Sequence, residues 1–365
     1  MNKIEQAFEN LKTHPFTELQ LSDREKFHIG MLKFVLENST KNLYKDFFKT
    51  DFDKQKLSSH LEKDSVDLLI TDNTNNNSPY IIVEAKFKSG IHNTTYKGKC
   101  MSQLQKYVET NPDAKKGFLV SLFKELNTDK LKIESQKKES IKYFKNITFT
   151  GEILESIKSL DKTEWNGPNN AILIQFWIDY LKNLKVILDY VEGRHLNSLN
   201  NNSDCQFKKD SDELKLSGLF ERYRLSLVLE KINLFLLQNK DEKSIEDFGK
   251  IDNTHGNALL EFSFDFKNPP YSNFKSYGIQ WQMDKLKFFV NIDKLNEVDK
   301  DREKYLSKKG RELQLLIKKD KSELNEKVNR KGKFRSINIY ERSMFDDIND
   351  MPEKILKILN KIDEV

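Results

Sequence analysis

The sequence has few of the features that mark secreted, membrane-spanning or zinc-binding proteins. Cysteine occurs twice in 365 residues, at Cys100 and Cys205, so no disulfide framework is expected and neither residue has a partner at zinc-finger spacing. No run of about 18 apolar residues predicts a membrane helix, and the N-terminus lacks the apolar segment of a signal peptide. We therefore expect a protein of the reducing cytoplasm that does not enter the membrane.

Motifs for nucleotide hydrolysis and for serine esterases are also missing. The chain has no Gly-rich phosphate loop ending in Lys-Ser/Thr and no Gly-x-Ser-x-Gly elbow. Charge is high, with 62 Lys and Arg against 57 Asp and Glu for a net of +5, while 25 Phe and 12 Tyr supply material for a core. This mildly basic balance permits a nucleic-acid partner without requiring one.

The stretch from Val66 to Lys86 is the most informative part of the chain. Two short apolar runs, at 66–70 and 80–86, are separated by a polar loop and predict a β-hairpin. Asp67 lies near the start of the first run, and Glu84 and Lys86 share one face at the end of the second. Two carboxylates beside an ammonium group can hold Mg²⁺ and stabilise negative charge during phosphodiester hydrolysis. An unpaired carboxylate within an apolar run is costly, which favours a catalytic role over a plain turn residue.

Further motifs lie on either side of this hairpin in a recognisable order. Residues 101–107 read Met-Ser-Gln-Leu-Gln-Lys-Tyr, a Gln-Leu-x-x-Tyr helix beginning at Gln103, and residues 117–122 predict the next strand. Upstream, residues 24–36 predict a hydrophobic helix that contains Glu25 and His28 in a Glu-x-x-His pattern. Over roughly residues 1–160 this series resembles the PD-(D/E)xK nuclease superfamily, in its defence-type branch, although Val66 stands where the motif usually has Pro.

The resemblance implies roles for particular residues. Asp67, Glu84 and Glu25 would be metal ligands for Mg²⁺, with Mn²⁺ as a substitute, while Lys86, Gln103 and His28 would complete the catalytic group. Three of these residues have a structural alternative: Ser22 and Glu25 form a capping-box pattern, His28 suits a packed helix position, and Gln103 suits a helix surface. Tyr107 is interpreted as core packing.

The organisation of the chain changes near a turn-rich segment at 166–170. We predict a nuclease-like domain over 1–165, an α/β fold with a restriction-endonuclease-like mixed sheet flanked by helices. We predict an α+β C-terminal domain with an antiparallel sheet over 166–365, for substrate or partner recognition. It begins with long helices at 171–190 and 219–238. Strands are expected at 258–266, 277–283, 287–292 and 334–340, with a tight turn at Asp284-Lys285 and a closing helix at 353–362.

Basic residues gather late in the chain. Between Arg302 and Arg335 there are 13 Lys and Arg and 5 Asp and Glu, which leaves a net charge of +8. A solvated helix is the commoner explanation, but beside a nuclease-like domain the stretch also suits phosphate contacts. The predicted nucleic-acid-binding residues are Lys318, Lys319, Lys321, Arg330, Lys331 and Lys333.

Taken together, these features predict a Mg²⁺-dependent endonuclease that acts on nucleic acid, with DNA as the favoured substrate, in restriction or anti-phage defence. The alternatives are a catalytically silent nucleic-acid- or partner-binding protein on the same fold, and an RNase or DNA-repair nuclease. A homodimer and a defence-system partner protein also remain open.

Overall fold

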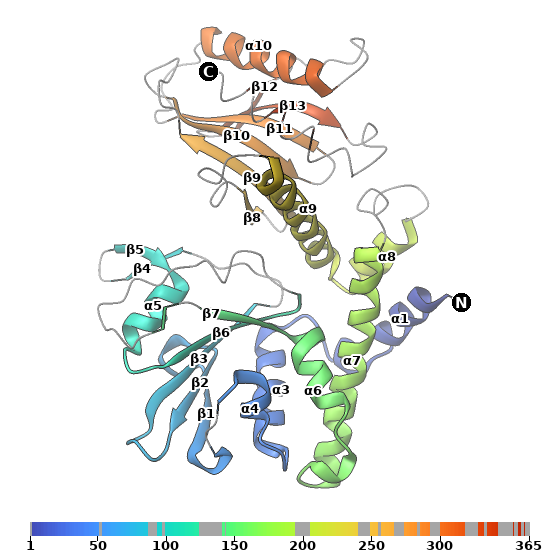
Figure 1. The fold of residues 1–365 in the computed structure, drawn as a ribbon. Helices are drawn as coiled ribbons and strands as arrows, with labels where there is room; N and C mark the ends of the chain where they lie inside the picture. Colours follow the sequence, from blue (N-terminus) through green and yellow to red (C-terminus); the bar gives the residue numbers. More distant parts are fainter. Residues whose placement is uncertain are drawn as a thin grey trace. The chain divides into compact units, whose positions relative to one another are not determined.

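The computed structural model describes residues 2–50, 53–86, 93–96, 99–123, 141–142, 144–193, 205–239, 249–254, 257–265, 274–282, 285–292, 300–317, 328–331 and 334–341, with 353, 357–358 and 361. The chain divides into two compact units (Figure 1). The first comprises Met1–Tyr190 with Lys209–Ser217, and the second comprises Val191–Lys208 with Gly218–Val365. None of the helices in the described residues combines the length and apolar character needed to cross a membrane.

The first unit contains a five-stranded mixed sheet in the order β1-β2-β3-β6-β7. The first three strands pair antiparallel, whereas β3, β6 and β7 run parallel. The central strands are almost wholly buried, as expected for strands covered on both faces. Their bounds are β1 Leu57–Leu61, β2 Leu68–Asp72, β3 Ser78–Lys86, β6 Lys116–Ser121 and β7 Phe144–Thr148, with a separate two-stranded pair of β4 Asn93–Tyr96 and β5 Lys99–Ser102.

Helices cover both faces of this sheet (Figure 1). On one face, α5 (Gln103–Thr110) buries Leu104 and Val108 in a cluster with Leu69 and Ile82 of the sheet. On the other face, α3 (Glu25–Asn38) packs against β1 and β3, and α4 (Leu43–Phe48) packs Phe48 against Phe118 of β6. The unit also contains the helices α1 Lys3–Lys12, α2 Pro15–Glu18 and α6 Leu154–Lys158, with short 3-10 turns at Lys54–Lys56, Lys63–Ser65 and Lys162–Glu164 and a π turn at Phe149–Ile153. The division between the two units falls within α8 (Cys205–Glu213).

The long helix α7 (Pro168–Gly193) belongs mainly to the first unit, contrary to the boundary predicted after residue 165. Its Tyr180 hydroxyl donates a 2.8 Å hydrogen bond to the carbonyl of Ser22, and its Trp177 indole N–H donates to a ring nitrogen of His28 at 3.2 Å. The turn-rich segment before the helix suggested a boundary. The apolar stripe of α7 instead completes the core of the preceding residues, and apolar spacing alone does not say which surface a helix covers.

The second unit contains a six-stranded antiparallel sheet in the order β12-β13-β11-β10-β9-β8. Helices α9 (Ser217–Asn239) and α10 (Lys300–Ile317) belong to the same unit. Its strands are β8 Gly249–Thr254, β9 Asn257–Asp265, β10 Phe274–Gln282, β11 Lys285–Ile292, β12 Val328–Lys331 and β13 Phe334–Glu341.

The structure confirms a mixed α/β protein with a separate antiparallel sheet, and all four strands predicted in the second half are present as β9, β10, β11 and β13. Lys285 was predicted in the turn but pairs with Gln282 as the first residue of β11. Strands β1, β4, β5, β8 and β12 were not predicted, because their sequences are largely polar and carry no apolar run. The predicted closing helix at 353–362 lies mostly outside the described residues.

Candidate active site

Asp67 and Glu84 lie opposite each other at one end of the paired strands β2 and β3. The antiparallel register joins Leu68 to Val83, so the next pair of residues along the ladder is Asp67 with Glu84. The Asp67 Oδ2 atom also accepts a 2.8 Å hydrogen bond from the backbone N–H of Ala85. Residues directly opposite each other point to the same face of a sheet. The hairpin therefore brings two carboxylates together, as its sequence predicted.

Glu84 is a buried carboxyl group with unused hydrogen-bonding capacity. Its side chain is 0% exposed; Oε1 is paired with the ammonium group of Lys86, and Oε2 has no hydrogen-bond partner among the described residues. Burial, followed by the negative charge of Asp67, raises the pKa of Glu84 to about 8, although Lys86 opposes the shift. A carboxylate in this environment gains stabilisation from any cation that enters beside it.

Lys86 supplies the nearest positive charge to this carboxyl group. Its Nζ lies 2.5 Å from Oε1 of Glu84, and its side chain is 6% exposed. The two residues are two positions apart on β3, so they share the face that also presents Asp67. The ammonium group offsets only part of the cost of burying Glu84, because the pKa of that carboxyl remains above its ordinary value.

Helix α5 adds two polar side chains to the same face. Gln103, the first residue of the helix, donates through Nε2 to the hydroxyl of Tyr107, while its Oε1 is buried without a hydrogen-bond partner in the described structure. Burial, and then the charge of Glu84, raise the pKa of the Tyr107 hydroxyl. Tyr107 therefore joins the carboxylate site as well as the apolar cluster, whereas the sequence interpretation assigned it to the core alone. The four-residue spacing of Gln103 and Tyr107, which places both on one helix face, was the available signal.

His28 is placed differently from the prediction. It is fully buried, with Nε2 2.9 Å from the carbonyl of Ser22 and Nδ1 receiving the Trp177 N–H. Its ring also packs on Phe149 and Tyr180. Burial lowers its pKa to about 4, so the ring is neutral near pH 7. Because both nitrogens are used inside an aromatic core, we correct the catalytic assignment of His28 to a structural one.

Replacing His28 with alanine is expected to lower the free energy of unfolding by about 2–4 kcal/mol, because it removes a packed ring and leaves the buried Trp177 N–H without an acceptor. Urea unfolding measures the change. His60→Ala is the control, since His60 is only partly buried on β1 and makes one side-chain hydrogen bond, to Thr71. Wild-type stability in the His28 variant would return this residue to the list of catalytic candidates.

Glu25 does not form the predicted capping box. Helix α3 begins at Glu25 itself, and its N-cap residue Arg24 makes no side-chain capping hydrogen bond. Ser22 lies further back, where its carbonyl accepts from Tyr180. The neighbouring Lys26 binds Glu62, and the negative charge of Asp67 helps to raise the pKa of Lys26. The start of α3 thus contributes positive charge to the surroundings of Asp67.

The group formed by Asp67 and Glu84 fits a hard divalent cation. Carboxylate oxygens are the ligands that Mg²⁺ prefers, and the buried Oε2 of Glu84, which has no hydrogen-bond partner among the described residues, is a suitable donor. Within the part of the chain that the structure describes, no three His, Cys, Asp or Glu residues gather as a metal-binding group, so Glu25 is not joined to the pair as the predicted third ligand. A cation held by two carboxylates would complete its coordination with water and substrate, as Mg²⁺ commonly does.

The predicted nucleic-acid-binding residues fall largely beyond what the structure describes. Lys318, Lys319, Lys321 and Lys333 lie outside the described residues, and Arg330 and Lys331 are defined only as members of β12. Comparisons with family models, with curated proteins and with solved structures each find no match to this chain.

Proposed function

We propose that this protein is a Mg²⁺-dependent endonuclease that hydrolyses phosphodiester bonds, most readily those of DNA. The observation that supports the proposal best is the group of partly buried Asp67 and buried Glu84 and Lys86 on adjacent strands, in which Oε1 of Glu84 is paired with Lys86 and Oε2 has no hydrogen-bond partner among the described residues. Burying the Glu84 carboxylate beside the charge of Asp67 costs free energy. Such an arrangement is reasonable where a cation and a phosphate complete it.

In this mechanism Asp67 and Glu84 would hold a Mg²⁺ ion, and the backbone N–H of Ala85 orients Asp67. The chemistry that such an ion would supply there is Lewis-acid activation of the phosphate and of the attacking water. Lys86 keeps its ammonium group beside the reacting phosphate and stabilises the negative charge that develops there. Gln103 and Tyr107, linked by a hydrogen bond, fix the position of α5 against the carboxylates.

The second candidate function is binding of nucleic acid without cleavage, and one contact favours it. Lys86 Nζ lies 2.5 Å from Glu84, so the negative charge of Asp67 and Glu84 is partly neutralised without a metal ion. A protein that binds nucleic acid without cutting it would need no metal ion at this site. For either activity we propose that the second unit and the basic stretch between Arg302 and Arg335 select the nucleic acid or a partner, in restriction or anti-phage defence.

Cleavage is tested with the full chain on supercoiled plasmid, linear duplex, single-stranded DNA and RNA, each with Mg²⁺, with Mn²⁺ and with EDTA. The proposal expects nicked or linear plasmid with either metal ion and no product with EDTA. Binding of these substrates without cleavage in Mg²⁺ or Mn²⁺ would mean that the protein binds nucleic acid and is catalytically silent. Cleavage of RNA alone would move the assignment to a ribonuclease.

Metal binding can be measured without any nucleic acid. Adding Mg²⁺ or Mn²⁺ at about 100 times its dissociation constant is expected to stabilise the folded wild-type protein by about 2.7 kcal/mol, seen as a rise in melting temperature at pH 8. Glu84→Gln should abolish the rise, because an amide is a poor ligand for a hard cation. The exposed Glu109→Gln on α5 should keep it. Equal rises in melting temperature for the wild type, Glu84→Gln and Glu109→Gln would mean that the metal ion binds elsewhere.

A further inference from the structure

The first unit contains a buried amide that neither the sequence interpretation nor the proposed chemistry uses. Asn146 lies on β7 and is 8% exposed. Its Oδ1 atom is buried and has no hydrogen-bond partner among the described residues. Leaving a buried acceptor unpaired destabilises a folded protein, so this oxygen indicates a donor that reaches it in another state of the molecule.

Hydrogen bonds fix the orientation of the Asn146 amide. The hydroxyl of Ser121 donates its one proton to the carbonyl of Phe123 at 2.6 Å, so the hydroxyl oxygen can only accept from Asn146. Asn146 therefore directs its NH₂ group to Ser121, at 3.1 Å. The amide is held in one orientation, and its carbonyl oxygen is left for a different donor.

Asn146 lies on the face of the sheet that carries the carboxylate site. Ile82 and Phe144 occupy one row of the ladder and pack in the same apolar cluster, so both point to the face covered by α5. Glu84 and Asn146 each lie two residues further along the same strands. Because side chains alternate along a strand, they point to that same face.

Lys86 is a donor that can reach this oxygen. It pairs directly with Ser121 of β6, which binds the Asn146 amide. Strand β7 lies two strands from β3, about 10 Å at 4.8 Å per strand, and the amide together with the flexible four-carbon stem of lysine can span that distance. Leu119 lies between Glu84 and Asn146 in the ladder. Asn146 is therefore placed to accept from Lys86 rather than to join Glu84 as a metal ligand.

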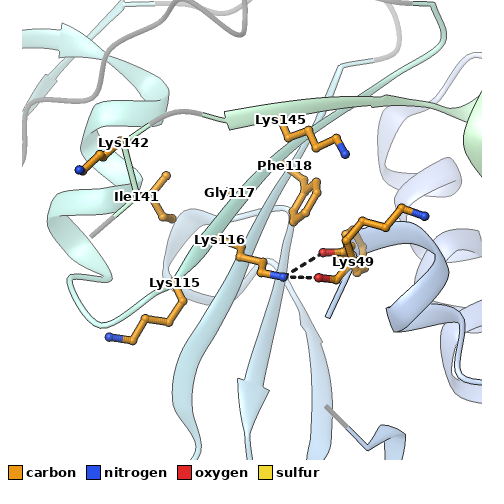
Figure 2. A pocket seen from close by; sticks show the side chains of 9 residues that line it. Lys49, Lys115, Lys116, Gly117, Phe118, Ile141, Lys142 and Lys145 are labelled. Atoms are coloured by element: carbon orange, nitrogen blue, oxygen red, sulfur yellow. Dashed lines mark hydrogen bonds between the residues drawn. The ribbon is translucent and has the colours of Figure 1, made fainter. Parts of the chain in front are cut away.

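The acceptor that Lys86 uses is also the proposed metal ligand. At the opposite end of β6, Lys116 donates to the carbonyl oxygens of Phe48 and Lys49, which are neutral and permanent acceptors (Figure 2). Lys86 instead contacts Oε1 of Glu84. A divalent cation at Glu84 would repel the ammonium group, and a buried ammonium without an acceptor is costly. Lys86 therefore needs a second acceptor if Glu84 is to bind a cation.

We propose that Asn146 is a positioning residue for Lys86, which has two alternative acceptors on this face. The ammonium group contacts Glu84 in the metal-free protein and donates to Oδ1 of Asn146 when Glu84 serves as a ligand. An ammonium group has three donors, so two remain for the reacting phosphate. This inference rests on the proposed nuclease function and adds the residue that holds Lys86 during the reaction.

Isothermal titration calorimetry with Mn²⁺ tests the proposal in the full chain without nucleic acid. Asn146→Leu is expected to weaken Mn²⁺ binding about tenfold, because Lys86 then stays on Glu84 and competes with the metal ion. In the Lys86→Ala background the same substitution should leave the affinity unchanged, since no ammonium group competes. A loss of equal size in both backgrounds would show a purely structural role for Asn146 and overturn the proposal, as would wild-type affinity in Asn146→Leu.

The matched control is Thr150→Val, which removes another buried hydrogen bond at this end of the sheet, from the hydroxyl of Thr150 to the carbonyl of Leu122. It should lower the melting temperature and leave Mn²⁺ affinity unchanged. Weakening equal to that in Asn146→Leu would mean that any damage to this region impairs the site, and it would contradict the specific role of Asn146.

A crystal structure of Glu84→Met in EDTA tests the second acceptor without any metal ion. This substitution keeps the length of the side chain and removes the carboxylate, so Lys86 is expected to lie within hydrogen-bond distance of Asn146 Oδ1. Lys86 directed to any other group would overturn the inference. This result is separate from the test of the proposed function, because a wild-type protein that binds no Mn²⁺ would contradict that function, whereas the position of Lys86 in the variant decides the role of Asn146.

Discussion

Asp67→Asn and Glu84→Gln are each expected to reduce cleavage by at least ~10²–10³-fold, and Lys86→Ala by a similar factor. The first two remove an oxygen ligand for the cation and change side-chain volume little. The third removes the ammonium group that stabilises the reacting phosphate. Initial rates of plasmid nicking in Mg²⁺ measure the losses, with Glu109→Gln as a control that removes an exposed carboxylate from the neighbouring helix.

The pH dependence of the cleavage rate distinguishes the role of Lys86 from that of Glu84. Glu84 must lose its proton to hold a cation, so cleavage should increase as the pH rises toward its pKa of about 8. Lys86 lowers that pKa, and Lys86→Ala should therefore move the midpoint of the pH profile upward as well as reduce the rate. A Lys86 variant with an unchanged profile and an unchanged rate would have no part in the mechanism.

In metal-free buffer, Glu84→Gln is expected to stabilise the folded protein by about 1–3 kcal/mol at pH 8. The pKa of Glu84 is about 8 in the folded protein and 4.5 ordinarily, so the folded state holds this proton more tightly than the unfolded state. The contribution of Glu84 to stability is therefore greatest at low pH and is lost as the pH rises from about 4.5 to 8. The glutamine variant has no such proton to lose.

Urea unfolding of wild type and variant at pH 5 and pH 8, both in EDTA, measures this effect. His28 titrates in the opposite direction, since its pKa is lowered to about 4 and stability from its neutral ring is lost as the pH falls below 6.5. Subtracting the variant from the wild type at each pH removes that shared contribution. If the difference in the free energy of unfolding between wild type and variant does not grow from pH 5 to pH 8, the pKa of Glu84 is not raised in the folded protein.

The strands were predictable wherever their apolar residues dominate. The apolar runs around Ile70 and Ile82 predicted β2 and β3, and the alternation of apolar and polar residues predicted β9, β10 and β11 in the second unit. Polar strands such as β1, Leu57–Leu61, were not predictable because pairing with β2, rather than their own pattern, makes them strands. The capping box at Ser22 was wrong because α3 begins at Glu25 with Arg24 as its N-cap, so Ser22 lies outside the helix.

That Glu84 and Lys86 share a face follows from their sequence alone, because alternation along a strand is a local property, and so does the position of Asp67 at the start of the paired strand. What surrounds these residues follows only from packing in three dimensions. Burial of Glu84, the approach of Tyr107 and the placement of His28 in an aromatic core all depend on residues distant in the chain. Desolvation and long-range charge are set by packing, and no pattern within one segment contains that information.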